Sequence, residues 1–330
     1  MTKKITARIT AVGAYLPEKV LKNTDLEKMV DTSDSWIVQR TGIHERRIAD
    51  KDEFTSTMGV KAAQQARECI SLEPAKIDAI ICATMTPDYL SPSTASLIQA
   101  SLRAVNACAL DIQAACTGFL YALSLAKGWV ESGMYTNVFV VASEKNSAFI
   151  DYEDRNTCVL FGDGAGAVVV QSEGPGLEIR HIALGAEGNL ANLIQIPAGG
   201  CRNTSSAETV RDKQHFIKVQ GREVFKHAVR RMEAAIKDCL EKTALPEHHI
   251  NWLVPHQANL RIMEAVAKDF NIPSERVFKT IDRFGNTSSS TIPIALFELE
   301  KQHPIQKNEN LVLVAFGGGL TWGASLLTKI

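Results

Sequence analysis

The feature of this 330-residue sequence that most restricts its fold is a repeated order of elements. Short apolar segments, each a candidate strand, occur at residues 77–84, 109–112 and 138–141 and again at residues 250–255, 277–281 and 311–314. The segments between them are longer and amphipathic. This alternation is typical of an α/β protein whose strands are buried. Because it occurs twice, the sequence predicts two related halves.

The two halves also end alike. Phe161–Val169 and Phe316–Leu326 each combine a glycine-rich stretch with apolar residues, which predicts a tight turn that leads into a closing strand. Internal repetition of this length favours a pseudo-two-fold molecule, since its period is far longer than that of a solenoid. The clearest cluster of chain breakers is Ser172–Gly176. We therefore expect an N-terminal half at residues 1–174 and a C-terminal half at residues 175–330.

Charge excludes several classes of partner. The 36 Lys and Arg residues nearly balance the 37 Asp and Glu residues, and the net charge is −1. No field of one sign therefore points to nucleic acid or to an anionic membrane. The first eight residues carry charge without the apolar core of a signal peptide, and no later segment offers the roughly 20 apolar residues of a membrane span. The expected location is the cytoplasm.

The seven cysteines occur without a C-x-x-C pair or a regular interval. That pattern argues against a disulfide framework and against a zinc site. Most of them stand among apolar residues, so the sequence predicts that they are small buried hydrophobic side chains.

Cys116 is the exception, because it falls where a predicted strand turns into a helix. Phe119, Leu123, Ala126 and Val130 recur at helical spacing after it, so the helix buries one face and its first turn opens at the strand end. Unpaired N–H groups and the positive end of the helix dipole there would stabilise a thiolate. An ordinary buried cysteine fits the same segment equally well.

His256 and Asn286 occupy loops of the second half. His256 follows the predicted strand that ends at Val254, and the carboxyl ends of strands are where α/β proteins gather ligands. Asn286 lies between a predicted strand and a helix that begins near Thr287. Taken alone, His256 also suits the role of a structural histidine, and Asn286 that of a helix cap. A Cys, a His and an Asn at such junctions of two related halves together indicate a catalytic site.

The chain resembles the β-ketoacyl-acyl-carrier-protein synthase III family, the initiating condensing enzymes of the thiolase superfamily. The match runs along essentially the whole chain. Its anchors are the segments Asp31–Ile37, Arg40–Ile43, Ala114–Cys116, Phe161–Gly166, Val254–Asn259, Gly285–Ser288 and Phe316–Gly319. The Cys, His, Asn set distinguishes this branch from thiolases, which use a second cysteine, and from elongating synthases, which use two histidines.

The resemblance implies a five-layered αβαβα architecture, a homodimer and two half-reactions. A short acyl-CoA, such as acetyl-CoA, first acylates Cys116, and the N–H groups of Cys116 and Gly318 would stabilise the oxyanion. Malonyl-acyl carrier protein then loses carbon dioxide, and His256 and Asn286 would donate hydrogen bonds to the enolate oxygen. The resulting carbanion attacks the acyl group, which predicts ping-pong kinetics. The resemblance implies no cofactor besides the CoA thioester substrate, and no metal.

The resemblance also assigns binding residues. A helix capped near Ser33 places Trp36 and Arg40 on one face. The residues expected to contact CoA or to line its tunnel are Thr32, Trp36, Arg40, Arg155, Gly221, Phe225 and Asn259, with Trp36 and Arg155 on either side of the adenine and Asn259 on the pantetheine arm. Those expected to meet the acidic carrier protein are Lys226, Arg261 and Lys268. The alternative without a binding role is that the tryptophan is simply half-buried and that the charged side chains are solvated surface residues.

Two positions depart from the family pattern. Ser91 stands where a Phe often reaches across the dimer to close the partner's acyl pocket, so either a larger primer is admitted or Leu90 fills the space. Asp269 follows Lys268 where a second Lys is frequent, which weakens or shifts the expected carrier-protein footprint. Primer length therefore stays open.

Three other functions compete with condensation. An acyl transferase or hydrolase could use Cys116 and His256 but would not need Asn286. A binding protein on the same scaffold would tolerate loss of these residues, and all three are present. The glycines of Gly162–Gly166 precede a strand, which argues against a dinucleotide site.

Overall fold

The computed structural model describes residues 5–330, and each half folds around its own sheet. The first half comprises β1 (Arg8–Tyr15), α3 (Thr55–Cys69), β4 (Ala79–Ala83), α4 (Thr94–Leu102), β5 (Cys108–Ile112), α5 (Gly118–Glu131), β6 (Val138–Glu144) and β7 (Gly164–Gln171). The second comprises β8 (Leu177–Ala186), α7 (Gly221–Thr243), β11 (Ile250–Pro255), α8 (Leu260–Asp269), α10 (Thr291–Gln302), β12 (Asn310–Gly317) and β13 (Thr321–Lys329). The predicted boundary at residue 174 falls between β7 and β8 and stays a prediction.

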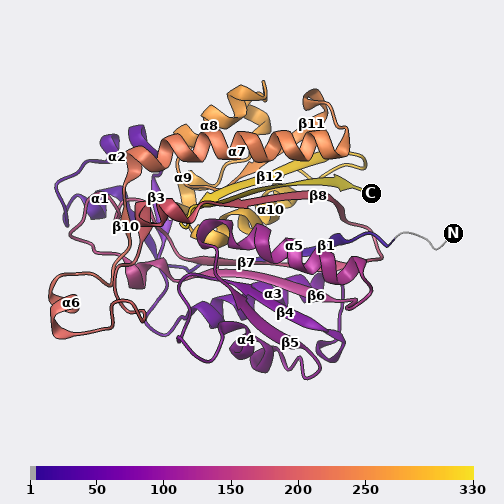
Figure 1. The fold of residues 1–330 in the computed structure, drawn as a ribbon, viewed down its shortest axis with the longest axis horizontal. Coiled ribbons are helices and arrows are strands. Elements are labelled where there is room, and N and C mark those ends of the chain that lie inside the picture. The colour runs from indigo at the N-terminus through magenta and orange to yellow at the C-terminus, as the bar shows by residue number, and fades with distance from the viewer. Residues whose placement is uncertain (1–4) are drawn as a thin grey trace.

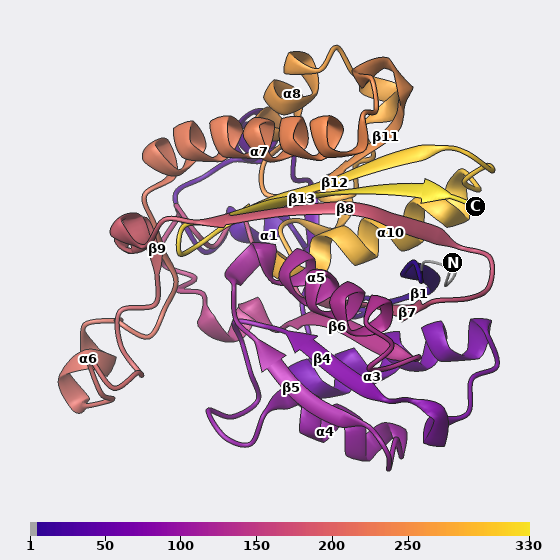
Figure 2. The same cartoon turned by 45° about the vertical axis from the view of Figure 1, so that its right-hand side comes forward.

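Shorter helices and strands connect these elements. They are β2 (Val20–Lys22), α1 (Asn23–Leu26), α2 (Asp34–Thr41), β3 (Glu45–Arg47), β9 (Ile194–Gln195), α6 (Ala207–Arg211), β10 (Lys218–Val219) and α9 (Ile281–Phe284), with short 3₁₀ turns that include η2 (Ala115–Thr117) and η7 (Ser288–Ser290). Helix α6 lies in an excursion that leaves the main body between β9 and β10 (Figure 2).

The two sheets repeat one strand order. The first runs β5-β4-β6-β7-β1, with β4 parallel to β5 and β6, and with β7 antiparallel to β6 and β1. The second runs β11-β12-β13-β8, with β11 parallel to β12 and β13 antiparallel to both neighbours. Strands β1 and β8 pair briefly, so that the two sheets are joined into one nine-stranded hydrogen-bonded order. The predicted pseudo-symmetric halves are confirmed.

The strand predicted at residues 277–281 does not form. Val277 makes only an isolated parallel bridge to Leu253, at the place where the second sheet would carry its counterpart of β5. The side chain of Gln257 explains this difference. Its Oε1 accepts hydrogen bonds from the N–H groups of Thr280 and Ile281, at 2.9 and 3.1 Å, so the backbone turns into α9.

The helices complete five layers (Figure 1). Helices α3 and α4 cover the outer face of the first sheet, and α7 and α8 cover the outer face of the second. Helices α5 and α10 lie between the sheets, where α5 contacts β6 and β8 and α10 contacts β7 and β11. The order αβαβα is therefore confirmed.

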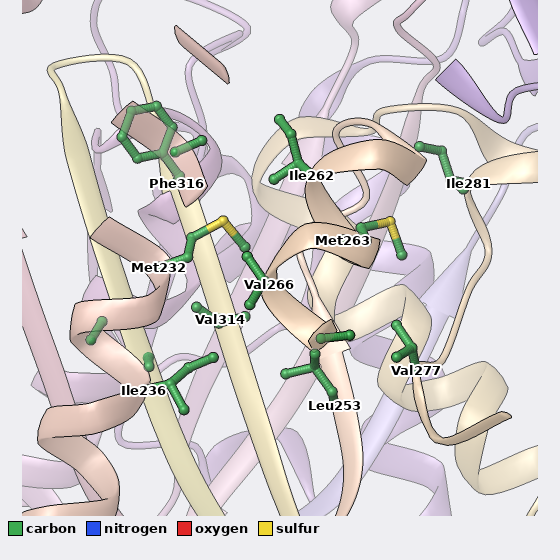
Figure 3. Packing of buried hydrophobic residues seen from close by; sticks show 14 of the residues in the cluster. Met232, Ile236, Leu253, Ile262, Met263, Val266, Val277, Ile281, Val314 and Phe316 are labelled. Atoms are coloured by element: carbon green, nitrogen blue, oxygen red, sulfur yellow. The ribbon is translucent and has the colours of Figure 1, made fainter. Parts of the chain in front are cut away.

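The apolar faces predicted from spacing are buried. Phe119, Leu123, Ala126 and Val130 on α5 are at most 1% exposed. On the opposite side of the second sheet, residues of α7 and α8 pack against β11 and β12, and Figure 3 shows their interdigitation. Packing of this kind removes apolar surface from water on both faces of each sheet and fixes the strand ends in space.

The prediction for the other cysteines is only half right. All seven cysteines are free; Cys82, Cys158 and Cys239 are buried, but three others lie exposed on helix, strand and loop surfaces. Within residues 5–330, no helix is both long and apolar enough to cross a membrane.

Candidate active site

Cys116 lies in the turn η2, between β5 and α5, as the sequence predicts. Ala115 before it has φ +46°, a left-handed conformation that turns the chain sharply at the end of the strand. Gly317 packs directly beneath this turn, because a Cβ on Gly317 would lie 2.8 Å from the backbone nitrogen of Cys116. The missing side chain therefore lets the two halves meet at the cysteine.

The thiol is not a resting thiolate. Burial raises the pKa of Cys116 to about 12; a hydrogen bond to Ser288 acts in the opposite direction and is the smaller effect. Desolvation disfavours the charged form of a thiol, so the raised pKa runs against the thiolate that the sequence predicts.

His256 provides a neutral imidazole on the same pocket. It follows β11, is 3% exposed, and burial lowers its pKa to about 3. Its Nδ1 lies 2.6 Å from the hydroxyl of Thr291 at the start of α10. The backbone N–H of His256 bonds to Val314 of β12 at 2.7 Å, which fixes the loop to the sheet. The imidazole is therefore neutral in the free protein.

Asn286 is held by both halves. Its N–H bonds to Leu160 and its carbonyl oxygen accepts from Gly162, at 2.9 and 3.0 Å. The side-chain Oδ1 accepts a hydrogen bond from the N–H of Ser288 at 2.8 Å, two residues on, while the N-cap positions of η7 and α10 are Thr287 and Ser290. The helix begins later than predicted, because the turn η7 precedes α10. With Oδ1 engaged, the Nδ2 group is the donor left for a ligand.

These three residues line one largely apolar cavity of about 140 Å³. Its other lining residues include Met85, Leu160, Ile194, Ile217, Val219, Val224, Phe225, Ala228, Met232, Ile262 and Phe316. Three of them, Met232, Ile262 and Phe316, belong to the packed cluster in Figure 3. The cavity is therefore an extension of the core, and such surroundings suit an acyl group.

A wider and more polar cleft of about 680 Å³ adjoins this cavity. Gly221, Phe225 and Asn259 line both spaces, so they stand at the junction. The outer cleft carries Arg40, Arg222, Lys226 and Arg261 beside Trp36. Cations around an open cleft attract phosphate groups, whereas the apolar interior excludes them.

Two arginines lie over the ring of Trp36. Helix α2 begins after Ser33, whose hydroxyl accepts from the N–H of Trp36, as predicted. The guanidinium carbons of Arg40 and Arg155 lie 4.9 and 5.0 Å from the centre of the Trp36 ring. Arg155 also donates to the carbonyl of Asp31 at 2.8 Å. Because Arg155 already covers the ring, a base could enter between them only after this side chain moves.

The remaining predicted contacts are distributed around the cleft. Asn259 caps α8 by accepting from Arg261 N–H, and its Nδ2 donates to the carbonyl of Arg40. Lys226 is exposed and pairs with Glu223 at 2.9 Å. Lys268 is exposed at the end of α8, and its neighbour Asp269 pairs with Lys237. The hydroxyl of Thr32 is buried and, within residues 5–330, has no hydrogen-bond partner.

Leu90 and Ser91 do not line the cavity of their own chain. Both are exposed, and Leu90 is 90% accessible. Met85 of the same loop contributes to the cavity instead, and sequence reasoning missed it. A role of Leu90 or Ser91 in a partner's pocket stays a prediction.

Sequence reasoning also missed a buried polar network behind the cavity. Residues 287–291 are five consecutive hydroxyl side chains, each at most 2% exposed. Two of them, Ser288 and Ser289, bond to Glu144, which is fully buried at the end of β6. The signal was available, since five adjacent hydroxyl residues next to a candidate catalytic Asn exceed what a helix cap needs. No cluster of three or more metal-type side chains occurs in the described part of the chain.

Comparison with known proteins agrees with this arrangement. Residues 110–188 match the family model for 3-oxoacyl-[acyl-carrier-protein] synthase III, and residues 240–329 match the model for its C-terminal region. The chain is 56% identical to a β-ketoacyl-[acyl-carrier-protein] synthase III of Chlamydia caviae over 99% of this chain and 98% of that protein. It is 48% identical to one of Caldanaerobacter subterraneus over 99% of both.

A solved structure of 3-oxoacyl-[acyl-carrier-protein] synthase III from Aquifex aeolicus superposes with a TM-score of 0.91 at 46% identity, covering 98% of this chain and all of that one. The fold and the cysteine-bearing pocket thus define a condensing enzyme of the thiolase-like class. Within that class, the chain belongs to the 3-oxoacyl-[acyl-carrier-protein] synthase III family.

Proposed function

We propose that this protein condenses a short acyl-CoA with malonyl-acyl carrier protein, giving 3-ketoacyl-acyl carrier protein, carbon dioxide and CoA. Such a reaction initiates fatty-acid synthesis. The observation that carries the proposal is the meeting of Cys116, His256 and Asn286 on one apolar cavity that opens into a cation-lined cleft. An acyl-CoA thioester would place its acyl group in the apolar cavity and its phosphates in the cation-lined cleft.

The first half-reaction transfers the acyl group to Cys116. Its thiol loses its proton to water, and the sulfur attacks the thioester carbonyl. Within residues 5–330, neither the Cys116 N–H nor the Gly318 N–H has an oxygen acceptor, so both are free to stabilise the oxyanion. The C–S bond to CoA then breaks, and the CoA thiolate takes a proton from water.

In the second half-reaction the neutral imidazole of His256 and the Asn286 Nδ2 group donate hydrogen bonds to the malonyl thioester oxygen while the bond to the carboxylate breaks and carbon dioxide leaves. The enolate carbon attacks the acyl group on Cys116. When the sulfur departs, it takes a proton from water. Over both half-reactions one proton is consumed.

Binding of the two substrates follows from the outer cleft. Thr32, Trp36, Arg40 and Arg155 would hold the nucleotide of CoA, with Arg155 moving off the Trp36 ring to admit the adenine. Gly221, Phe225 and Asn259 would line the pantetheine passage. The exposed cations Lys226, Arg261 and Lys268 would meet the acidic carrier protein, and the pairing of Asp269 with Lys237 leaves Lys268 without competition from that carboxylate.

A homodimer in the cytoplasm completes the proposal. Strand β5 is an outer strand of the sheet, and its residues are half-buried or exposed, unlike the fully buried β4 beside it. Such an edge offers unpaired backbone groups to a second copy. Leu90 is 90% exposed in the chain, as expected of an apolar side chain that a partner covers. In that dimer, Leu90 or Ser91 would close the partner's acyl pocket.

The test follows both half-reactions separately. Cys116→Ser should give no acyl adduct by intact mass after incubation with mixed acyl-CoAs, whereas Cys201→Ser, which removes an exposed thiol, should acylate normally. Asn286→Ala should acylate at nearly the normal rate but release carbon dioxide from malonyl-acyl carrier protein about 100-fold more slowly, as for loss of an oxyanion donor. Normal condensation by Asn286→Ala would overturn the assigned roles. The adduct would also identify the preferred primer.

A further inference from the structure

The hydroxyl of Thr321 lies where the glycine turn of one half meets the cysteine turn of the other. Thr321 begins β13 and pairs with Gly317, the last residue of β12. Its Oγ1 can donate to the carbonyl oxygens of Ala114 and Gly318, at 3.0 and 3.1 Å. It can also donate to the hydroxyl of Thr117 at 3.2 Å. A hydroxyl has one proton, so these acceptors share it, and one side chain contacts both turns.

The glycine turn needs such an anchor. Gly317–Gly319 are three consecutive glycines, and a backbone without Cβ atoms rotates freely. Next to β8 the turn is held by two backbone hydrogen bonds of 2.9 and 2.8 Å that Leu320 and Glu187 exchange. Towards Cys116, the carbonyl of the middle glycine is bonded to the Thr321 hydroxyl. This bond fixes the peptide plane that follows the middle glycine, and so restricts the direction of that glycine's own N–H.

The cysteine turn receives the same support. The carbonyl of Ala114 accepts from the N–H of Thr117 at 3.1 Å, which closes η2 around Cys116, and its second acceptor site faces Thr321. Ala115 has φ +46°, an unusual conformation for a residue with a side chain. A turn in such a conformation depends on its surroundings, and this hydrogen bond comes from the opposite half of the chain.

We infer that Thr321 is a positioning residue for the oxyanion site. Its hydroxyl would set the separation of the two N–H groups, those of Cys116 and Gly318, that stabilise the negative oxygen. The inference rests on the proposed function, because that function assigns these two donors. Thr321 does not line the cavity, so it acts on the substrate only through the two turns. Preorganised donors work only when they are held at the right distance from the oxygen.

The two kinds of negative oxygen in the reaction have different donors. Acylation of Cys116, and the later attack on its acyl group, both place charge on the oxygen of the carbonyl that is bonded to the sulfur. Loss of carbon dioxide instead places charge on the malonyl thioester oxygen, which would face His256 and Asn286. A change at Thr321 should therefore slow both attacks and spare decarboxylation, whereas general damage to the site would slow all three steps.

Thr321→Val tests this separation, because valine keeps the branched shape, suits a strand and removes the hydroxyl. Acylation by acetyl-CoA, followed by rapid-quench mass spectrometry, should slow about ten-fold, as for a shift of a few tenths of an ångström. Enzyme acylated to completion beforehand should then form 3-ketoacyl product from malonyl-acyl carrier protein about ten-fold more slowly. Release of carbon dioxide in the same reaction should stay within about two-fold of wild type. The unused enolate would take a proton from water and appear as acetyl-acyl carrier protein.

Two variants serve as controls. Thr321→Ser keeps the hydroxyl and should acylate within about three-fold of wild type. Thr328→Val removes a half-buried hydroxyl at the other end of β13, where it donates to Asn310 Oδ1 at 2.8 Å, and should leave all three rates unchanged. Thermal melting checks that each variant is folded, and Thr321→Ala replaces Thr321→Val if the latter is not.

Two results would overturn the inference. One is acylation by the folded variant without the Thr321 hydroxyl at the wild-type rate. The other is a loss of decarboxylation as large as the loss of acylation, because the hydroxyl would then support the whole site instead of the oxyanion donors. A wild type that forms no acyl adduct would refute the proposed function itself, before any variant is compared.

Discussion

A methyl group at residue 317 would enter space that the Cys116 turn occupies. An ideal Cβ there lies 2.8 Å from Cys116 N, 3.1 Å from Thr117 N and 3.2 Å from Thr117 Oγ1, whereas ordinary contacts lie at 3.4–4 Å. Gly317 does not have a positive φ, so alanine suits its backbone and only the contact matters. The turn must move by roughly 0.6 Å, because close-packed interiors transmit such overlaps.

Two effects should follow from Gly317→Ala. Overpacking of a buried site costs about 1–3 kcal/mol of unfolding free energy. A displacement of this size at the nucleophile should slow acylation of Cys116 by about 10- to 100-fold, because misplacement by 1 Å costs about 100-fold. The catalytic loss should therefore exceed what a small loss of stability at assay temperature explains.

Rapid-quench mass spectrometry of the acyl adduct measures the rate, and thermal melting measures the stability. Gly128→Ala on α5 is the control, with no atom within 4 Å of the new Cβ. If Gly317→Ala acylated within two-fold of wild type, the contact between the glycine turn and Cys116 would not be what positions the sulfur.

Three further predictions concern other parts of the molecule. Between pH 6.5 and 4.5 the unfolded chain protonates His256, whereas the folded chain does not, because the pKa of His256 there is lowered to about 3. In urea unfolding, the unfolding free energy of wild type should therefore fall by about 1.4 kcal/mol per pH unit more than that of His256→Asn. Parallel pH profiles of the two proteins would contradict this. Trp36→Ala should raise the KM for acetyl-CoA about ten-fold with little change in kcat in steady-state assays, and an unchanged KM would exclude Trp36 from the nucleotide site. Leu90→Asp should give monomers in sedimentation experiments. Met134→Asp, at another exposed apolar position, should not. A dimer that persists in Leu90→Asp would show that the dimer interface does not include Leu90.

The sequence predicted the fold well because the fold depends on patterns that are local. Short apolar runs in each half became β4, β6, β11 and β12, and the glycine-rich ends became the turns before β7 and β13. The failure at residues 277–281 has a non-local cause. Gln257, some 20 residues away, captures the backbone N–H groups there, and no periodicity within the segment reports that contact.

The candidate site was predictable in its residues but not in its electrostatics. Cys116, His256 and Asn286 could be found from their places at strand ends. The raised pKa of Cys116 could not, because it depends on burial by residues that are distant in sequence. The supporting residues Glu144 and Thr291 were missed for the same reason, since their partners are distant in sequence.

The repeated fold explains how one site acquires different chemistry from two similar halves. Strands β6 and β12 are equivalent, and aligning Val141-Ala142-Ser143-Glu144 with Val314-Ala315-Phe316-Gly317 places Glu144 opposite Gly317. Gly317 has no side chain, so the Cys116 turn of the other half sits directly on the strand end. Glu144 has a long one, and it reaches the Ser288 turn of the other half through hydrogen bonds. The same strand-end position thus lets the Cys116 turn approach the strand in one half and bonds to the turn that follows Asn286 in the other.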